Sequence, residues 1–290
     1  MATDFLVTDP LNATTPASTP AVTFASGGEA LLGVLHVPAG AGPHPIVVLL
    51  HGFPGNERNF DLAQALRRAG YAALVFHYRG SWGVGGSWSW RNVLDDAARV
   101  VAAVREESVS ATYRLDPRRV AVVGHSLGGF AALMTAAADE GVGAVVSVAG
   151  FDFGTASAAC RADPSVRAAY VESWDAELLP LRGTSGEALV AEMEAAGQAW
   201  SLARLAPKLA DRPVLLVGTG RDMVTPAEVH HWPLVEEYQA YPVSRLDHRL
   251  LPTDHALSDH RVALARTIVD FLDRCLRTPA ADATAVEQQA

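Results

Sequence analysis

A serine flanked by glycines is the feature of this chain whose residue types and spacing best fit covalent chemistry. The sequence GHSLGG fills residues 124–129 and holds Ser126 at its centre. A β-branched run, residues 120–124, precedes it, and a run of small apolar residues, 127–138, follows it. G-x-S-x-G between a strand and a helix makes a tight turn that lifts the serine hydroxyl above the sheet, beside the partial positive charge of the helix N-terminus. This context predicts that Ser126 is a nucleophile.

A serine nucleophile requires a base, and the base requires a carboxylate that orients it. In proteins that carry this strand–turn–helix nucleophile, the acid and then the histidine follow the serine along the chain. Asp222 comes just after the buried run 214–218, at the strand end where catalytic groups of open α/β sheets gather. His255 lies in the loop-like sequence LPTDHALSDHR, ahead of the last helical stretch. We therefore expect Ser126, Asp222 and His255 to form a catalytic triad.

Other residues compete for the roles of base and acid. His260 lies five residues beyond His255, but the pattern places it in the first turns of the last helix, with Ser258 as the N-cap. A catalytic histidine must reach over the serine from a loop, which favours His255. Four further candidates are a third histidine and three aspartates: His248, Asp247, Asp254 and Asp259.

Two backbone N–H groups are expected to stabilise the oxyanion that forms when the serine attacks a carbonyl. The first belongs to Leu127, the residue after the nucleophile. The second belongs to Phe53, in the glycine-containing sequence HGFPG that follows an apolar run. His51 and His125 adjoin these groups, and we interpret them as residues that orient the loops through hydrogen bonds.

Tryptophans are expected to shape the substrate pocket. Trp82, Trp88 and Trp90 crowd one segment between a strand and a helix, where they either wall an apolar acyl or aryl pocket or pack the core. Trp174 and Trp200 lie in a separate helical region, from which they can close the same pocket from above. Of these five, Trp82, Trp174 and Trp200 are predicted to contact the substrate.

Three further polar features admit both a structural and a functional interpretation. Arg79 can hold a substrate carboxylate, but pairing with Asp95 or Asp96 is favoured because a half-buried arginine is usually satisfied by a carboxylate. Glu57 can hold a substrate amine, although a solvated or loop-pairing role is favoured. The histidine pair at 230–231 has no obvious third ligand, and adjacent helix residues face different ways, so no metal site is predicted.

The elements that must position these residues alternate between short apolar runs and longer amphipathic stretches. Near-continuous apolar runs are typical of strands buried on both faces of a parallel sheet, and the strand–helix repetition predicts right-handed crossovers and a doubly wound sheet. The expected strands are residues 21–25, 31–37, 46–50, 71–77, 120–124, 144–148, 214–218 and, more weakly, 241–246. The expected helices are residues 60–69, 90–107, 127–138 and 259–276.

One region interrupts this alternation and carries helix-like pieces in place of strands. Residues 150–211 include two such pieces, 164–174 and 186–200, and we interpret the region as a helical cap inserted into a single α/β domain. That domain is expected to span residues 20–277. The remaining ends, residues 1–19 and 278–290, are rich in Thr, Pro, Ala and similar residues and are expected to be a flexible arm and a flexible tail without chemistry.

Composition narrows the classes of partner. A net charge of −9 argues against a nucleic-acid partner, which requires clustered Lys and Arg. No run reaches the ~20 apolar residues of a membrane span. The N-terminus lacks the basic start and apolar stretch of a secretory signal, so a cytoplasmic location is expected. Cys160 and Cys275 lie outside metal-binding patterns and are expected to be buried free thiols. No cofactor is predicted.

These residues together resemble the α/β-hydrolase superfamily over roughly residues 20–276. HGFPGNERNFDLAQALRRAGYAALVFHYRGSWGVGG and the ending DHALSDHR look like the branch related to prolyl oligopeptidase and dienelactone hydrolase, which supports His255 as the base. The resemblance implies an α/β-hydrolase fold, a mostly parallel eight-stranded sheet with helices on both faces and a helical cap insertion. The chain is too short for the propeller of true prolyl oligopeptidases, a departure that argues against peptidase activity.

The expected activity is hydrolysis of small-molecule carboxylic esters with a rather apolar acyl or alcohol part, through an acyl-enzyme on Ser126. One alternative is a peptidase or amidase that uses the same triad on short peptides. The other is a non-hydrolytic protein of this fold, such as a biosynthetic cyclase, although such proteins usually lack one of the triad residues.

Overall fold

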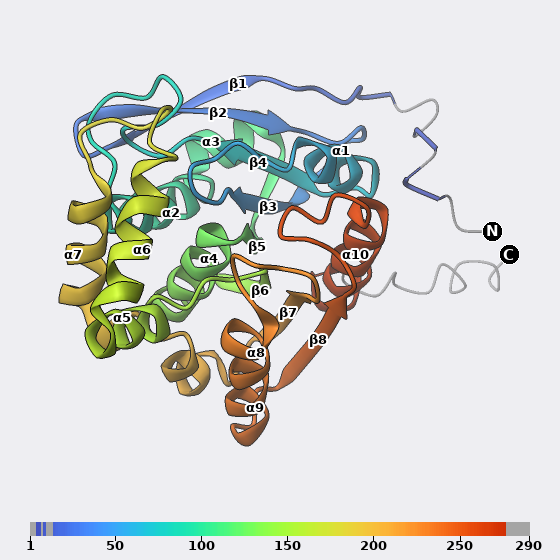
Figure 1. Ribbon diagram of the computed structural model, residues 1–290. Coiled ribbons are helices and arrows are strands. Elements are labelled where there is room, and N and C mark those ends of the chain that lie inside the picture. The colour runs from blue at the N-terminus through green and yellow to red at the C-terminus, as the bar shows by residue number, and fades with distance from the viewer. Residues whose placement is uncertain (1–3, 7, 10–13, 277–290) are drawn as a thin grey trace, which may run out of the picture.

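The computed structural model describes residues 4–6, 8–9 and 14–276. Across this described part, eight strands form one sheet in the order β1-β2-β4-β3-β5-β6-β7-β8 (Figure 1). β1 and β2 are antiparallel to each other, β2 is antiparallel to β4, and all other neighbours are parallel. The strands are Ala21–Ser26 (β1), Glu29–His36 (β2), His44–Leu50 (β3), Ala72–Phe76 (β4), Leu115–His125 (β5), Val142–Val148 (β6), Pro213–Thr219 (β7) and Arg245–Leu251 (β8).

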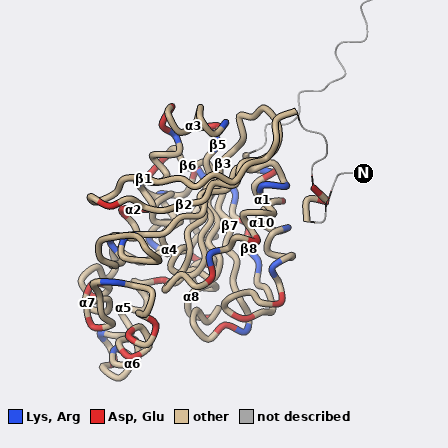
Figure 2. The backbone as a smooth tube through the Cα atoms, turned by 90° about the horizontal axis from the view of Figure 1, so that it is seen from above, with Lys and Arg blue, Asp and Glu red and all other residues tan. Residues whose placement is uncertain are grey.

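Helices cover both faces of the sheet because its central strands are apolar on both sides. In β3, Ile46, Val48 and Leu50 belong to one core and Val47 and Leu49 to the other, as the alternation of side chains along a strand requires. The first core is covered by α2 and α4 and the second by α1 and α10. These helices are Phe60–Arg68 (α1), Trp90–Ala103 (α2), Leu127–Ala138 (α4) and Arg261–Leu276 (α10). Figure 2 shows that charged residues lie mainly on the helices and loops around these strands.

The segment between β6 and β7 contains the expected helical insertion. Its α-helices gather on one side of the molecule in Figure 1, with a helical turn on each side of Ser201 leading back to the sheet. The α-helices are Phe153–Ala162 (α5), Pro164–Asp175 (α6) and Gly186–Ala196 (α7), and the 3₁₀ helices are Gly197–Trp200 and Ala203–Leu209. The predicted helix 186–200 is thus shorter than expected, because Gly197 takes a positive φ of 50° and ends it.

Other boundaries also differ from the sequence prediction, among them the start of β5, which begins at Leu115 and not at residue 120. The helix predicted over 90–107 ends at Ala103, and a separate helix, α3 (Glu107–Tyr113), follows. The intervening turn lets Arg105 pair with Asp139, a tertiary contact that apolar spacing does not reveal.

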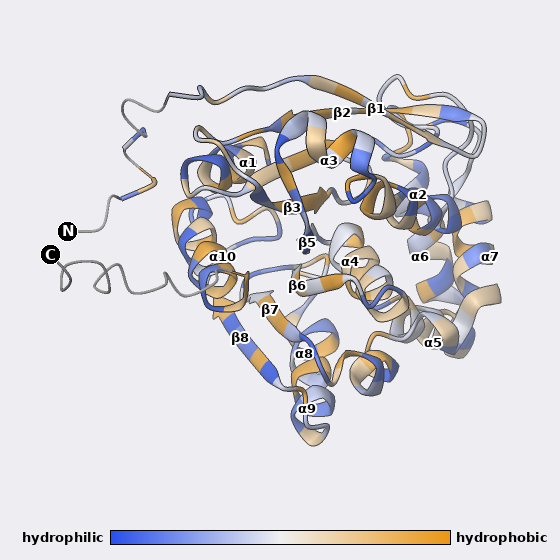
Figure 3. Cartoon of the chain, turned by 180° about the vertical axis from the view of Figure 1, so that it is seen from behind, coloured by the Kyte–Doolittle hydropathy of each residue, from blue (hydrophilic) through white to orange (hydrophobic). Residues whose placement is uncertain are grey.

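The last strand was also predicted too early. Residues 241–246 were expected to form it, but it runs over Arg245–Leu251, because Tyr241 ends helix α9 (Trp232–Ala240). As the edge strand beside β7, β8 has one open side and mixes polar and apolar residues, which Figure 3 shows as alternating bands. A search for apolar runs therefore misses it.

The described part of the predicted N-terminal arm contacts the domain. Arg68 Nε donates to the carbonyl oxygen of Phe5 at 2.7 Å, Arg266 pairs with Asp4 at 2.7 Å, and Leu6 packs on the core beneath α1 and α10. The predicted tail, 278–290, lies outside the described residues.

Two further expectations concern the cysteines, expected to be buried free thiols, and membrane spans, for which no apolar run was long enough. Cys160 and Cys275 are both free thiols; Cys160 is buried, whereas Cys275 is partly exposed. Among the helices of the described ranges, none has both the length and the apolar character needed to cross a bilayer.

Candidate active site

Ser126 lies at the turn from β5 into α4. Its backbone has φ 58° and ψ −121°, a conformation that residues with side chains rarely adopt. The turn requires glycine at position 124, because a Cβ there would overlap the carbonyl oxygen of Gly128. The Ser126 N–H donates to the carbonyl oxygen of Val148 at 2.8 Å, at the end of the neighbouring strand β6. The serine is thereby held at the carboxyl edge of the parallel strands.

Asp222 lies in the loop after β7, and its side chain is completely buried. Oδ1 accepts from the N–H groups of Val224 and Thr225 at 2.7 and 2.9 Å, and Oδ2 accepts from the hydroxyls of Thr219 and Thr225 at 2.6 Å each. Burial alone raises the pKa of this carboxyl, but hydrogen bonds from His255 and the threonines outweigh burial and hold the pKa well below its usual range. Asp222 is therefore ionised at neutral pH.

His255 reaches Asp222 from the loop between β8 and α10. Its Nδ1 lies 2.7 Å from Oδ2 of Asp222. Because a carboxylate only accepts hydrogen bonds, Nδ1 carries the hydrogen and Nε2 is the basic nitrogen. The backbone of the loop is held by His125, whose Nε2 donates to the carbonyl oxygen of His255 at 2.7 Å. Asp222 and His125 together fix the ring and the main chain of His255.

Ser126 and His255 line one cavity of about 240 Å³. Among the described residues, the hydroxyl of Ser126 has no hydrogen-bond partner, so the two side chains are neighbours that are not yet bonded. Hydrogen bonds between a nucleophile and its base are often long without substrate and shorten in the complex. Ser126 thus lines this cavity with a hydroxyl that is available for a new contact.

The loop from β3 brings a second backbone segment to the serine. A Cβ on Gly52 would lie 3.1 Å from the Cβ of Ser126, so the Gly52–Phe53 peptide passes directly beside the nucleophile. His51 Nδ1 donates to the carbonyl oxygen of Gly52 at 2.8 Å. Because the carbonyl and N–H of a trans peptide point in opposite directions, this bond also fixes the direction of the Phe53 N–H. Leu127 is the first residue of α4, where N–H groups have no acceptor within the helix.

The alternative bases and acids have other partners. His260 Nδ1 lies 2.8 Å from Asp259 Oδ1, on the surface. Asp254 accepts from the N–H and the hydroxyl of Ser258 at 2.8 and 2.7 Å. Ser258 lies three residues before α10 and is therefore not its N-cap, contrary to the sequence prediction. The remaining alternatives lie on the edge strand β8: Asp247 and His248. Among these candidate bases, His255 is the histidine that the structure places in contact with Asp222.

Two of the three tryptophans expected to contact substrate lie away from the serine. Trp200 packs against Phe130 and Phe153 with ring centroids 5.7 and 5.8 Å apart, and is buried beneath the cap. Trp82 donates from its indole N–H to the carbonyl oxygen of Pro54 at 2.9 Å and lines a separate cavity beyond the HGFPG loop. For these two the structure corrects the expectation: one packs the core and the other supports a loop.

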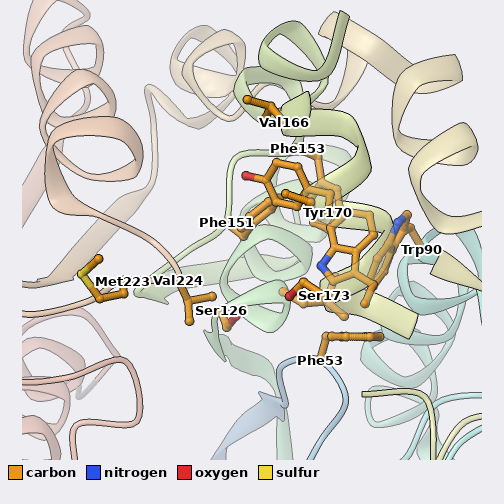
Figure 4. A pocket seen from close by; sticks show the side chains of 13 residues that line it. Phe53, Trp90, Ser126, Phe151, Phe153, Val166, Tyr170, Ser173, Met223 and Val224 are labelled. Atoms are coloured by element: carbon orange, nitrogen blue, oxygen red, sulfur yellow. The ribbon is translucent and has the colours of Figure 1, made fainter. Parts of the chain in front are cut away.

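The third, Trp174, lines the cavity of Ser126 and also a larger cavity of about 440 Å³ that meets it at the serine. Figure 4 shows several of the aromatic rings that surround this space, among them Trp90, Phe151 and Tyr170. The other aromatic residues that line the larger cavity are Phe53, Trp90, Phe151, Phe153 and Tyr170. Sequence reasoning missed Phe151, Phe153 and Tyr170 as site residues. The available signals were the position of FDF just after an apolar strand and the spacing of Tyr170 and Trp174, four residues apart on a helix.

The other polar features occupy structural positions. Arg79 Nε donates to Oδ1 of the buried Asp96 at 2.6 Å, and Glu57 accepts from the Asn59 N–H at 2.6 Å. His230 Nδ1 accepts a backbone N–H at the start of α5 at 3.0 Å. Within the described ranges, no group of three or more His, Cys, Asp or Glu side chains is arranged to hold a metal ion.

Comparison with known proteins places this geometry in a family. Residues 47–267 match the model of the alpha/beta hydrolase family. An uncharacterised 31.7 kDa protein from the traX-finO intergenic region of Escherichia coli is 30% identical over 155 residues, which cover 50% of this chain and 51% of the relative. The chain thus spans about half the length of this relative.

Solved structures share the fold at low sequence identity. Est1E from Butyrivibrio proteoclasticus, with ferulic acid bound, has a TM-score of 0.69 and 19% identity and covers 88% of this chain and 99% of its own. An esterase from Pyrococcus furiosus has a TM-score of 0.65 and 14% identity, with coverage of 93% and 97%. The family model covers most of the chain, and the eight-stranded, mostly parallel sheet with helices agrees with this fold. The chain therefore belongs to the alpha/beta hydrolase family.

Proposed function

We propose that the protein is a serine hydrolase that cleaves small-molecule carboxylic esters through an acyl-enzyme. The observation that carries the proposal is the 2.7 Å contact between His255 Nδ1 and Asp222 Oδ2, with Ser126 on the same cavity as His255. An oriented neutral imidazole beside a strained serine is the arrangement that activates a hydroxyl as a nucleophile. An esterase among the proteins of the same fold agrees with this reaction class.

In the proposed mechanism, Ser126 Oγ attacks the ester carbonyl carbon while His255 Nε2 takes the hydroxyl proton. Asp222 holds the imidazole in its Nδ1–H form and stabilises the imidazolium that results. The N–H groups of Phe53 and Leu127 donate to the oxyanion. When the C–O bond breaks, His255 returns the proton to the departing alcohol. A water molecule then attacks the acyl-enzyme by the same steps and releases the acid.

An ester is favoured over an amide as the substrate. An amide nitrogen must be protonated more completely before it can leave, and peptide substrates are usually held along an extended groove. The space at Ser126 instead divides into two compact cavities of about 240 and 440 Å³, near or within the ~300–1,000 Å³ typical of small-molecule pockets. This supports a small-molecule ester with one group on each side of the carbonyl.

The test combines covalent labelling with paired substrates. Purified protein is treated with a fluorophosphonate, the labelled peptide is identified by mass spectrometry, and p-nitrophenyl esters are assayed beside aminoacyl p-nitroanilides. We expect the label on Ser126 and faster turnover of esters. Label on Ser126 with faster turnover of anilides would replace the esterase proposal by an amidase. Absence of both label and turnover would overturn the hydrolase proposal.

A further inference from the structure

The two cavities that meet at Ser126 differ in what lines them. The larger one is bounded by six aromatic rings and by aliphatic side chains, and none of the described residues that line it carries a charge. The smaller one contains His255 and, at its rim, the carboxylates of Glu57 and Glu177. Ser126, Phe53, Trp174 and neighbouring residues are common to both, so the serine stands where the two spaces join.

The position of His255 decides which part of an ester enters which cavity. After the attack, the imidazolium must protonate the oxygen that leaves, so the leaving group has to lie within hydrogen-bond reach of His255. His255 lines the smaller cavity but does not line the larger one, whose residues come from the cap, the HGFPG loop, the start of α2, the Ser126 turn and the Asp222 loop. The alcohol therefore departs through the smaller cavity, and the acyl group occupies the larger one.

The larger cavity is suited to an aromatic ring rather than to a flexible alkyl chain. Its rings already pack edge to face: Trp174 lies 5.1 Å from Trp90 and 6.3 Å from Phe53, at interplanar angles of 72° and 61°. Phe151 and Phe153 are 4.8 Å apart at 69°. Because the faces and edges of aromatic rings carry opposite partial charges, a cavity walled by rings favours another aromatic ring over a saturated group of the same size.

Helix α6 supplies one wall of this cavity and little of the protein core. Val166, Ala169, Tyr170, Ser173 and Trp174 line the cavity, a spacing that places them on one face of the helix. Trp174 alone among the residues of α6 is buried in the protein. Val166 and Tyr170 pack against the core but are only partly buried, and Ala169 is exposed, so a bound acyl group would cover more of this face (Figure 4).

We propose that the acyl group of the substrate is an uncharged arylalkyl group, a phenyl ring on a short chain, whose ring packs among Trp90, Phe151 and Trp174. A charged acyl group is disfavoured, because it would lose its hydration without gaining a counter-charge. In the reaction, the bond between Ser126 Oγ and the acyl carbon forms, the bond from that carbon to the alkoxy oxygen breaks, and the proton passes through His255 to the alcohol. This inference rests on the proposed ester hydrolysis.

The test compares methyl esters that differ only in the acyl group: 3-phenylpropanoate, 3-cyclohexylpropanoate, nonanoate and acetate. The cyclohexyl ester has the same carbon skeleton without the aromatic ring. We expect kcat/KM for 3-phenylpropanoate to exceed that for the cyclohexyl ester by about three- to tenfold, the typical worth of aromatic pair geometry beyond burial. Equal values for the two ring esters, or a preference for nonanoate, would overturn the proposal.

Substitutions in the larger cavity test whether its residues cause the preference for an aryl acyl group. Trp174→Leu is expected to reduce the ratio of aryl to cyclohexyl turnover, whereas Trp232→Leu, a matched change of a partly exposed tryptophan on α9, is expected to keep it. Because Trp174→Leu can also loosen the cap, Ala169→Phe, at an exposed position of α6, is used to fill the cavity. It should lower the ratio of phenylpropanoate to acetate turnover. An unchanged ratio in both cavity variants would contradict the assignment.

The failure of this inference is distinguishable from failure of the proposed function. Fluorophosphonate labelling of Ser126 and turnover of methyl acetate depend on the triad and the oxyanion donors, but not on an aromatic acyl group. Label and acetate turnover without an aryl preference would reject the acyl assignment alone. Loss of both would reject the esterase proposal itself.

Discussion

His125, the residue before the nucleophile, donates a hydrogen bond from Nε2 to the backbone carbonyl of His255 at 2.7 Å, and the two rings lie 4.8 Å apart. Burial, together with the charge of a protonated His255, lowers the pKa of His125 to about 3, so its ring is neutral and has a single N–H to donate. The strand–turn–helix motif thus holds the serine and, through its second residue, also the loop of the base.

This contact predicts a positioning role for His125. Replacing it with Leu removes the donor and leaves a buried carbonyl without a partner, which costs about 1–3 kcal/mol. We expect kcat to fall by about ten- to a hundredfold with a smaller change in KM, because the displaced His255 acts in the transition state. His125→Gln retains an N–H donor and should recover part of the loss. If Leu and Gln variants behave alike while their melting temperatures match the wild type, the hydrogen bond has no role in the reaction.

Ser126→Ala should remove nearly all turnover while the fold is retained. The loss is expected to be on the order of 10⁴ to 10⁶ in kcat, because the residues of a triad act as a unit. Steady-state kinetics with a p-nitrophenyl ester, beside circular dichroism of the variant, measures both quantities. Retention of a tenth of the wild-type kcat by a folded variant would exclude Ser126 as the nucleophile.

The two neighbouring histidines should respond very differently to truncation. His255→Ala is expected to lose activity to about the extent of Ser126→Ala, since the base and the nucleophile act together. His260→Ala serves as the control, because His260 pairs with Asp259 at the surface and has no contact with Asp222. We expect it to retain turnover within about twofold, as surface substitutions usually do. The opposite ranking of the two variants would reassign the base.

Asp222 is expected to contribute both to turnover and to the dependence of the unfolding free energy on pH. Its folded pKa is depressed, so its stabilising contribution is present in full above the unfolded carboxyl pKa of about 3.9 and is lost as the pH falls through the lower folded value. Asp222→Asn should therefore flatten the dependence of the unfolding free energy on pH between about pH 5 and pH 2. It should also lower kcat by about 10⁴, because the amide favours the wrong imidazole tautomer. Urea titrations at several pH values and steady-state rates test the two effects.

Buried neutral histidines add a second acid sensitivity at higher pH. Burial lowers the pKa of His51 and of His125 to about 3 each. Between about pH 6.5 and pH 3 the unfolded chain binds these protons and the folded chain does not, so the unfolding free energy should fall as the pH falls. Each histidine contributes about 1.4 kcal/mol per pH unit in that window. His125→Gln should show a shallower slope, and an unchanged slope would contradict burial of a neutral ring.

How much of the site was predictable depends on where each residue lies relative to the strands. Ser126 and Asp222 come directly after buried apolar runs, and the edge of a parallel sheet brings such residues together whatever the surrounding sequence. His255 was indicated by its order along the chain and by its loop context. The directions of cap side chains were not predictable, because they depend on how helices pack on one another. Trp200 was therefore expected in the pocket, whereas Tyr170 was overlooked.

The edge strand shows the same limit for the fold. Strands buried on both faces have continuous apolar runs, and these runs were located correctly, although β5 begins at Leu115, ahead of its apolar run. β8 pairs on one side and mixes polar and apolar residues without strict alternation, so its position depends on pairing with β7, which the sequence pattern does not display. Its misplacement by several residues did not affect the assignment of Asp222 or His255, which lie in the loops beside it.

In the proposed reaction, the smaller cavity also determines which molecules can reach the acyl group on Ser126. Pro54, Asn56 and Glu177 line both this cavity and the cavity beside Trp82, so the two spaces adjoin along the HGFPG loop. The route by which the alcohol leaves is also the route by which water must arrive, and another alcohol can follow it. In the proposed reaction, an alcohol bound in the smaller cavity would compete with water for the acyl group, so the occupant of this cavity would set the ratio of transesterification to hydrolysis.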